Sequence, residues 1–240
     1  MDVQLFIPCF IDQFHPQIAF NTIEILNKAG CQVHYNPKQT CCGQAVFNGG
    51  YWNEAAVLAK KFLADFNAEI PIVSPSASCV AYIIQHYEKL LDKESEDFKQ
   101  YANMKIFELS DFLVNQLKVD DLGAKFPHKV TFHDACSALR HYGIKAEPRK
   151  LLSKVKGLEL IEMNESETCC GFGGSFSVKF NAISSAMVEK KVQNALNTQA
   201  AYIVSTEVSC LMNINGYCEK QKLPIRGIHI TDILINAAND

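Results

Sequence analysis

The chain has 240 residues, of which 48% are apolar and 20% charged, a composition typical of a soluble globular protein with one large domain or two small ones. Its 23 basic residues do not outnumber its 26 acidic residues, so it lacks the basic excess that binds nucleic acid phosphates. It also lacks a long uncharged apolar run, and Asp2 stands where a signal peptide would carry positive charge. We therefore expect a cytoplasmic protein with no nucleic acid partner and no direct insertion into a membrane.

The first half of the chain alternates short apolar runs with stretches of helical periodicity. The apolar runs predict strands at residues 3–7, 32–35 and 71–74. Between them, residues 16–29 and 53–66 carry apolar side chains at helical spacing, which predicts two amphipathic helices. The expected buried positions are Ile18, Thr22, Ile25, Leu26 and Ala29 in the first helix and Ala55, Leu58, Ala59, Phe62 and Phe66 in the second.

The second half of the chain repeats this alternation. Strands are predicted at residues 129–132, 158–162 and 202–205. A helix is predicted over residues 183–196, with the buried positions Ile183, Met187, Val192, Ala195 and Leu196. Each half closes with a strand-like run, a Ser/Thr-Asp pair expected to cap a helix, and a helical pattern. Strands that alternate with helices indicate an α/β fold built of β-α-β units around a mainly parallel sheet.

The cysteine positions show that the two halves are copies of one unit. Of ten cysteines, four in the first half recur in the second at offsets of 127, 128, 128 and 131 residues: Cys9, Cys41, Cys42 and Cys79 match Cys136, Cys169, Cys170 and Cys210. Each vicinal pair stands in the sequence Thr-Cys-Cys-Gly. We therefore expect two tandem α/β units related by pseudo-twofold symmetry, as cysteine-rich domains over residues 1–124 and 125–240.

The predicted strands bring the repeated cysteines together. Cys9 follows the first strand, Cys41 and Cys42 follow the second, and Cys79 follows the third. Loops that follow parallel strands lie at the same edge of the sheet, where open α/β sheets usually bind ligands. The second copy places Cys136, Cys169, Cys170 and Cys210 in the same way. Each unit is therefore predicted to gather four thiols at one crevice, as a metal site requires.

Four thiolates per unit fit either zinc or an iron–sulfur cluster. Structural zinc sites usually contain Cys-x₂₋₄-Cys knuckles, and neither half has one around these cysteines. Adjacent cysteines strain a mononuclear tetrahedral site, whereas a cluster offers several iron atoms, so the vicinal pairs favour a polynuclear centre. Gly43 and Gly171 would let the backbone approach such a centre and donate hydrogen bonds to its sulfurs. A catalytic dithiol is a further alternative, and Cys31 and Cys218 are interpreted as packing residues.

Three other residues stand near the second cysteine group in the sequence. His133 could be a ligand or proton carrier, although a hydrogen-bonded histidine at the end of a strand is the favoured interpretation. Arg140 and His141 follow Cys136 closely and could compensate cluster charge or hold a substrate carboxylate, or simply face solvent. The glycine-rich stretch 171–175 lacks the lysine and spacing of a phosphate-binding loop, which disfavours nucleotide binding.

These motifs resemble a known group, the cysteine-rich Cys-Cys-Gly repeat proteins that include the B subunit of heterodisulfide reductase and the iron–sulfur subunit of glycolate oxidase. Within this group the sequence is most similar to the lactate utilization protein A family. The resemblance rests on Pro8-Cys9, the first Cys-Cys-Gly motif with residues 47–51, and residues 75–79 in the first half, and on residues 133–136, 169–179 and 210–216 in the second. It covers nearly the whole chain.

The resemblance implies a subunit without flavin or haem that carries iron–sulfur clusters, of [4Fe–4S] type, on the eight repeated cysteines. It also implies partner proteins, the other iron–sulfur and accessory lactate utilization proteins, with which such a subunit oxidises L-lactate to pyruvate. Complete motifs of this group have a fifth cysteine three residues before the last, where this chain has Ser76 and Glu207. Four thiols per site leave open a smaller cluster, an oxygen ligand, or zinc at one or both sites.

Three hypotheses for function follow. The leading one is an electron-transfer subunit of an L-lactate-oxidising complex, an oxidoreductase component that is not active alone. The second is a scaffold subunit of the same complex that is stapled by zinc and carries no electrons. The third is a thiol–disulfide reductase that uses the vicinal cysteines, as the kinship with heterodisulfide reductase suggests.

Overall fold

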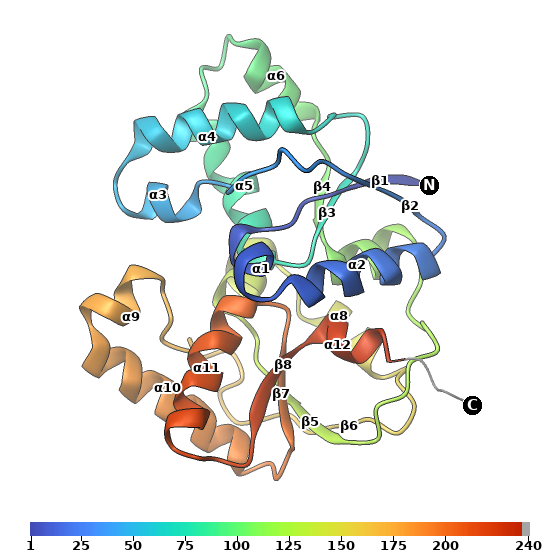
Figure 1. Cartoon of the computed structure of the whole chain (residues 1–240), viewed down its shortest axis with the longest axis vertical. Coiled ribbons are helices and arrows are strands. Elements are labelled where there is room, and N and C mark those ends of the chain that lie inside the picture. The colour runs from blue at the N-terminus through green and yellow to red at the C-terminus, as the bar shows by residue number, and fades with distance from the viewer. Residues whose placement is uncertain (237–240) are drawn as a thin grey trace. The chain divides into compact units, whose positions relative to one another are not determined.

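The computed structural model describes residues 1–236 of the chain (Figure 1). These residues form two compact units, the first over residues 1–117 and the second from Lys118 onward. None of the helices in the described part of the chain combines the length and the apolar character needed to cross a lipid bilayer. Each unit is a parallel sheet with helices, which confirms the predicted α/β fold with two tandem units; the pseudo-twofold relation stays a prediction.

The first unit is built on a sheet of four parallel strands. They are β1 (Asp2–Leu5), β2 (Gln32–Tyr35), β3 (Ile72–Ser74) and β4 (Ile106–Glu108), in the order β2-β1-β3-β4. Val3 pairs with Val33 across β1 and β2, and Leu5 pairs with Val73 across β1 and β3. Because β1 and β3 are fully buried at these positions, the apolar runs of the sequence form the centre of the sheet.

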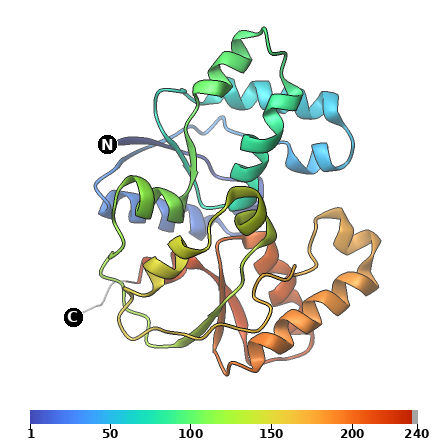
Figure 2. The ribbon, with the colours of Figure 1, turned by 180° about the vertical axis from the view of Figure 1, so that it is seen from behind.

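Helices cover both faces of this sheet. They are α1 (Cys9–Phe14), α2 (Pro16–Lys28), α3 (Gln44–Asn48), α4 (Trp52–Asp65), α5 (Ala77–Leu90), α6 (Glu96–Asn103) and α7 (Leu109–Asp111), which continues into the π-helical turn η1 (Phe112–Gln116). Helices α4, α5 and α6 contact one another, while α2 packs along β2. Figure 2 shows α2 and residues 109–116 side by side on the face away from α4 and α5.

The second unit repeats the same architecture. Its strands are β5 (Lys129–Phe132), β6 (Glu159–Leu160), β7 (Tyr202–Ser205) and β8 (Arg226–His229), in the order β6-β5-β7-β8, all parallel. Its helices are η2 (Ser137–Tyr142, a π-helix), α8 (Ala146–Leu152), α9 (Ser175–Lys179), α10 (Asn181–Leu196), α11 (Val208–Lys220) and α12 (Ile230–Leu234). Helices α10 and α11 contact each other, and α8 contacts α12 (Figure 1).

Helix α10 buries Val192 and Ala195 as predicted, but its buried face is turned away from the predicted Ile183. Ile183 is 56% exposed, whereas Ser184 and Lys191 are buried with Val188 and Val192. Two hydrogen bonds explain this orientation of the helix. Ser184 Oγ donates to the carbonyl of Gly171, and Lys191 Nζ donates to the carbonyl of Ser166. The helix therefore turns toward the backbone of the cysteine loop, at the cost of exposing an isoleucine.

The last helix of each unit is capped by a buried residue that precedes the predicted cap. Glu108 ends β4, and its carboxylate accepts hydrogen bonds from the N–H groups of Ser110 (2.7 Å) and Asp111 (3.2 Å). His229 ends β8, and its imidazole accepts from the N–H of Thr231. The predicted Ser/Thr caps are wrong, because each helix begins one residue before the serine or threonine and the preceding side chain reaches the free N–H groups.

Glu108 predicts a pH dependence of stability. Burial raises the pKa of this carboxyl from 4.5 to about 8. A raised pKa means that the folded state binds the proton more tightly, so the contribution of Glu108 is complete below pH 4.5 and is lost as the pH rises toward 8. We expect Glu108→Gln to flatten the fall in unfolding free energy across this window, by up to about 1.4 kcal/mol per pH unit.

Urea unfolding of the metal-free protein at a series of pH values measures this slope. The exposed residue Glu54 supplies the matched control, since Glu54→Gln should leave the slope unchanged. An unchanged slope in Glu108→Gln would show that this carboxyl does not titrate in that range.

Candidate metal centres

The first unit brings its four repeated cysteines to the carboxyl ends of its strands. Cys9 begins α1 after β1, Cys41 and Cys42 lie between β2 and α3, and Cys79 lies in the first turn of α5 after β3. β2 lies on one side of β1 and β3 lies on the other side. The order of the strands therefore reverses at the carboxyl end of β1. Such a switch point is where open parallel sheets bind ligands.

Interactions between the sulfur atoms link these cysteines in a row. Cys9 Sγ lies 3.6 Å from Cys41 Sγ, and further side-chain hydrogen bonds join Cys41 to Cys42 and Cys42 to Cys79. Cys42 and Cys79 are buried, whereas Cys9 and Cys41 are half-buried. The row therefore runs from partial solvent contact into the interior of the unit.

The row concentrates negative charge on one sulfur. Hydrogen bonds from Cys42 and Cys9, together with the backbone N–H of Gly43, hold the pKa of Cys41 well below its usual range. The same contacts and burial raise the pKa of Cys9 and of Cys42. Metal ligation requires the thiolate form, so binding of a cation would release the protons of the thiols in this row.

The second unit places its cysteines in the same positions. Cys136 stands directly before η2 and follows β5, Cys169 and Cys170 lie in the loop after β6, and Cys210 lies in the first turn of α11 after β7. A side-chain hydrogen bond with Cys169, followed by burial, raises the pKa of Cys136. Cys170 is likewise hydrogen-bonded to Cys169 and to Cys210. The structure therefore brings the predicted cysteines of both units together.

The glycine of each Cys-Cys-Gly motif shapes the site. Gly43 and Gly171 have φ angles of +94° and +86°, in the left-handed region that favours glycine. Their N–H groups point back at the first cysteine of the pair, at 3.4 Å from Cys41 Sγ and 3.3 Å from Cys169 Sγ. A Cβ atom on Gly171 would also lie 2.7 Å from the carbonyl oxygen of Ser184. The motif is thus a tight turn that presents two sulfurs and donates a hydrogen bond to one of them.

Helix N-termini support the last cysteine of each site. Cys79 and Cys210 are the third residues of α5 and α11, helices of 14 and 13 residues. The positive end of a helix dipole favours a thiolate or an anionic centre. Ser76 and Glu207, which replace a fifth cysteine, are the buried N-cap residues of these helices. Glu207 accepts a hydrogen bond from Ser209 Oγ at 3.1 Å, so a buried carboxylate lies beside Cys210.

His133 joins the second cysteine group. Its ring is fully buried, and a nitrogen of the ring, Cys170 Sγ and Cys210 Sγ lie within 4.8 Å of one another. The backbone of Ser166 lies close enough to raise the pKa of the His133 ring, but neither ring nitrogen has a hydrogen bond of normal geometry among the described residues, so the interpretation of His133 as a hydrogen-bonded strand-end histidine stays open. Within residues 1–236 this is the one group of three metal-binding side chains found with ligand atoms so close together.

Lys191 brings a positive charge to the second site that the sequence did not reveal. It is 1% exposed, and Nζ donates to the backbone carbonyls of Glu165 (2.5 Å) and Ser166 (3.0 Å) in the loop before Cys169. Burial lowers the pKa of Lys191 to about 8, while the nearby Cys170 opposes this shift. The available signal was a lysine one residue before the predicted buried position Val192 of this helix.

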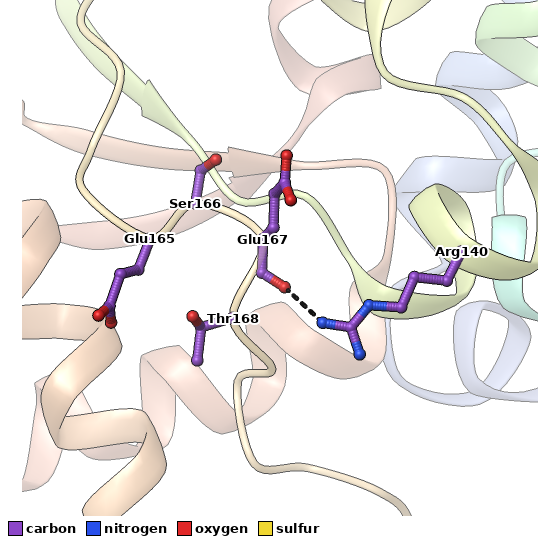
Figure 3. A pocket seen from close by; sticks show the side chains of 5 residues that line it. All are labelled: Arg140, Glu165, Ser166, Glu167 and Thr168. Atoms are coloured by element: carbon purple, nitrogen blue, oxygen red, sulfur yellow. Dashed lines mark hydrogen bonds between the residues drawn. The ribbon is translucent and has the colours of Figure 1, made fainter.

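Two arginines flank the same loops. Arg149 makes a bidentate ion pair with the buried Asp134, at 2.7 and 2.8 Å, which fixes the segment between His133 and Cys136. Arg140 lines a cleft of about 430 Å³ with residues 165–168, and its Nη2 donates to the carbonyl of Glu167 at 3.3 Å (Figure 3). Cys31 and Cys218 are buried and outside both groups.

Comparison with known proteins supports this description. The family model described as "Cysteine-rich domain" matches residues 3–84 and 130–215, one match in each unit. The chain is 37% identical to lactate utilization protein A 2 of Bacillus cereus, over the whole length of both proteins. It is 41% identical to lactate utilization protein A of Halalkalibacterium halodurans, covering 98% of this chain and 96% of that protein.

The chain belongs to the lactate utilization protein A family. Among solved structures, a hypothetical protein from Helicobacter pylori has a TM-score of 0.66 and 12% identity, and matches all of this chain and 49% of its own; it supports the fold alone. In this member of the lactate utilization protein A family, the four sulfurs of each unit and the imidazole of His133 in the second unit are ligands that fit a thiophilic metal, and the glycine N–H groups donate hydrogen bonds to the sulfurs.

The left-handed turn at Gly171 predicts a cost for any side chain there. Gly171→Ala adds a Cβ atom in contact with the Ser184 carbonyl as well as an unfavourable φ angle, so we expect a loss of roughly 1–3 kcal/mol in unfolding free energy. Gly143 is the matched control, since its φ angle is +101° and no atom lies within 4 Å of the added Cβ. Urea unfolding should show a larger loss for Gly171→Ala than for Gly143→Ala. Equal losses would mean that the close approach to α10 is not a constraint.

Proposed function

We propose that this chain is an iron–sulfur electron-transfer subunit of a cytoplasmic complex that oxidises L-lactate to pyruvate. The observation that supports it most is the duplicated four-cysteine site in a chain of the lactate utilization protein A family. The partners would be the other iron–sulfur and accessory lactate utilization proteins. Lactate oxidation releases two electrons and two protons, and clusters in both units would pass the electrons on one at a time.

The spread of the sulfurs in the first unit favours a polynuclear centre. In a tetrahedral zinc site with Zn–S bonds of about 2.3 Å, all sulfurs lie about 3.8 Å apart. The Cys9–Cys41 distance of 3.6 Å is of this kind, but the contacts continue pairwise from Cys41 to Cys42 and from Cys42 to Cys79, and the compact group of three ligands found in residues 1–236 is not one of cysteines alone. A row of thiols fits several metal ions better than one ion.

The charges around the sulfurs suit a negatively charged centre. The N–H groups of Gly43 and Gly171, the N-termini of α5 and α11, and the ammonium group of Lys191 all favour negative charge. The deeper cysteine of each pair is buried, which keeps solvent from part of the site. Hydrogen bonds to sulfur, net charge and burial are the features by which proteins tune iron–sulfur potentials.

Two further candidates each have one observation in their favour. The lowered pKa of Cys41 and the nearby Cys9 sulfur would suit a thiol–disulfide reductase, in which a disulfide substrate accepts two electrons as the two thiols oxidise. The compact group of His133, Cys170 and Cys210 would suit a zinc ion in a scaffold subunit. Neither explains the row of thiols in one unit and the duplicated site together.

Metal analysis after anaerobic purification tests the proposal. We expect iron and acid-labile sulfide in matched excess over protein, with an absorption band that bleaches on reduction by dithionite. Cys41→Ser and Cys170→Ser should each remove about half of the iron, because each disrupts one of two sites. The buried but unclustered Cys31 provides the control, since Cys31→Ser should keep both centres. Zinc without bleaching, or disulfide reduction by the iron-free chain, would instead favour the corresponding alternative.

Lys191 predicts the direction of a change in reduction potential. Reduction adds negative charge, so removing a nearby buried positive charge with Lys191→Met should lower the potential of the second centre and leave that of the first unchanged. The adjacent Lys190 is the matched control. Its side chain is exposed and its charge is screened by solvent, so Lys190→Met should change the reduction potential little. Redox titration followed by electron paramagnetic resonance measures both potentials. A shift of equal size in both variants would contradict a specific role of Lys191.

A further inference from the structure

We propose that His133 is a metal ligand of the second centre, which is therefore held by histidine as well as cysteine, whereas the first centre is held by cysteines alone. This inference rests on the proposed iron–sulfur function for the identity of the metal. It assigns a ligand that the repeated cysteine pattern does not contain.

The backbone of His133 fixes the imidazole beside the sulfurs. His133 is the residue directly after β5, and its N–H donates to the carbonyl of Val204 at 2.8 Å. Its own carbonyl accepts from Ser205 Oγ at 3.1 Å, so both backbone groups are tied to β7. From this position the ring reaches the two deepest cysteines of the unit, Cys170 and Cys210, with all three ligand atoms within 4.8 Å of one another.

The ring nitrogens of His133 are buried without a hydrogen bond of normal geometry among the described residues. Leaving a buried polar group without a partner is unfavourable, so buried histidines are normally hydrogen-bonded. His229, the other buried histidine of the second unit, follows this rule with Thr231 Oγ1 at 2.8 Å from Nδ1. The backbone of Ser166 lies near the ring of His133, but neither ring nitrogen has a hydrogen bond of normal geometry among the described residues.

The corresponding residue of the first unit shows that packing does not require a histidine here. Phe6 precedes Cys9 by three residues, as His133 precedes Cys136. Its ring is fully buried and packs edge-on against Phe62, with ring centroids 5.0 Å apart, and against Phe66 at 5.8 Å. An apolar ring therefore packs well at this position of the fold, and packing alone does not require a histidine there.

A histidine ligand would make the two centres unequal. Imidazole is neutral where a thiolate is negative, and replacing thiolates by histidines raises the reduction potential of a cluster. If His133 takes the place of one thiolate, the second centre would lie at a higher potential than a centre held by four thiolates.

Pulsed electron paramagnetic resonance of the whole chain, purified anaerobically, reduced, and labelled with ¹⁵N in histidine alone, tests the assignment. We expect a strong ¹⁵N coupling on one of two centres, which is lost in His133→Phe and kept in His128→Phe, a substitution of an exposed histidine of the same unit. His133→Cys, which restores a ligand, should recover the iron that His133→Phe loses but not the coupling, and its second centre should have a lower potential. Iron-loaded protein without a histidine coupling, or a coupling that survives in His133→Phe, would overturn the proposal.

A second probe separates this inference from the proposed function. If the chain binds no iron after anaerobic reconstitution, the iron–sulfur function fails, and Co²⁺ binding then tests His133 independently. X-ray absorption of the Co²⁺-loaded chain should show nitrogen together with sulfur ligands, with the nitrogen lost in His133→Phe. Ligation by sulfur alone would contradict the role of His133 whatever the native metal is.

Discussion

The structure depends on the parallel pairing of β1 with β2 and β3, and of β5 with β6 and β7. Parallel pairing forces each connection to cross over the sheet, so every strand ends at the same edge. Cysteines 32 to 74 residues apart therefore meet without any long-range signal in the sequence other than their place after a strand. The apolar strand cores supply the pairing, and the residue after each strand carries the chemistry.

The two units use one scaffold for two different environments. In the first, the position before the cysteines belongs to an aromatic cluster of Phe6, Phe62 and Phe66. In the second, His133 takes that position, and the buried Lys191 lies where the repeat offset of the vicinal cysteines places Leu63 in the first. Exchanging apolar contacts for buried polar groups costs stability unless the groups are satisfied. Backbone carbonyls satisfy Lys191, and a metal would satisfy His133.

Much of the fold and of the cysteine sites could be predicted from the sequence. The strands β2, β5 and β7 were predicted to the residue, because their β-branched and aromatic runs are bounded by polar turns. The repeat of four cysteines at nearly fixed offset predicted which thiols meet, since only the strand order of a parallel sheet was needed to place them.

The residues that sequence reasoning missed or misplaced have a common cause. In a sequence, a polar residue that is buried cannot be told from one on the surface. Glu108 was missed because the Ser-Asp pair that follows it was predicted as the cap. Lys191 was missed because only the apolar positions of its helix were predicted as buried. Ile183 was assigned to the core because it is apolar, yet the helix turns to serve the carbonyls of the cysteine loop. His133 could be placed near the second site from its position before Cys136, but its proximity to Cys170 and Cys210 could be seen only in the folded structure.

The central claim is that each unit holds its own iron–sulfur centre. Anaerobic native mass spectrometry of the intact chain measures this directly, because iron and sulfide add a characteristic mass for each cluster. Two successive increments of iron with sulfide are expected, with one increment lost when the vicinal cysteines of either unit are replaced by serine. Increments of zinc alone, or a single increment that both replacements abolish, would contradict two independent centres.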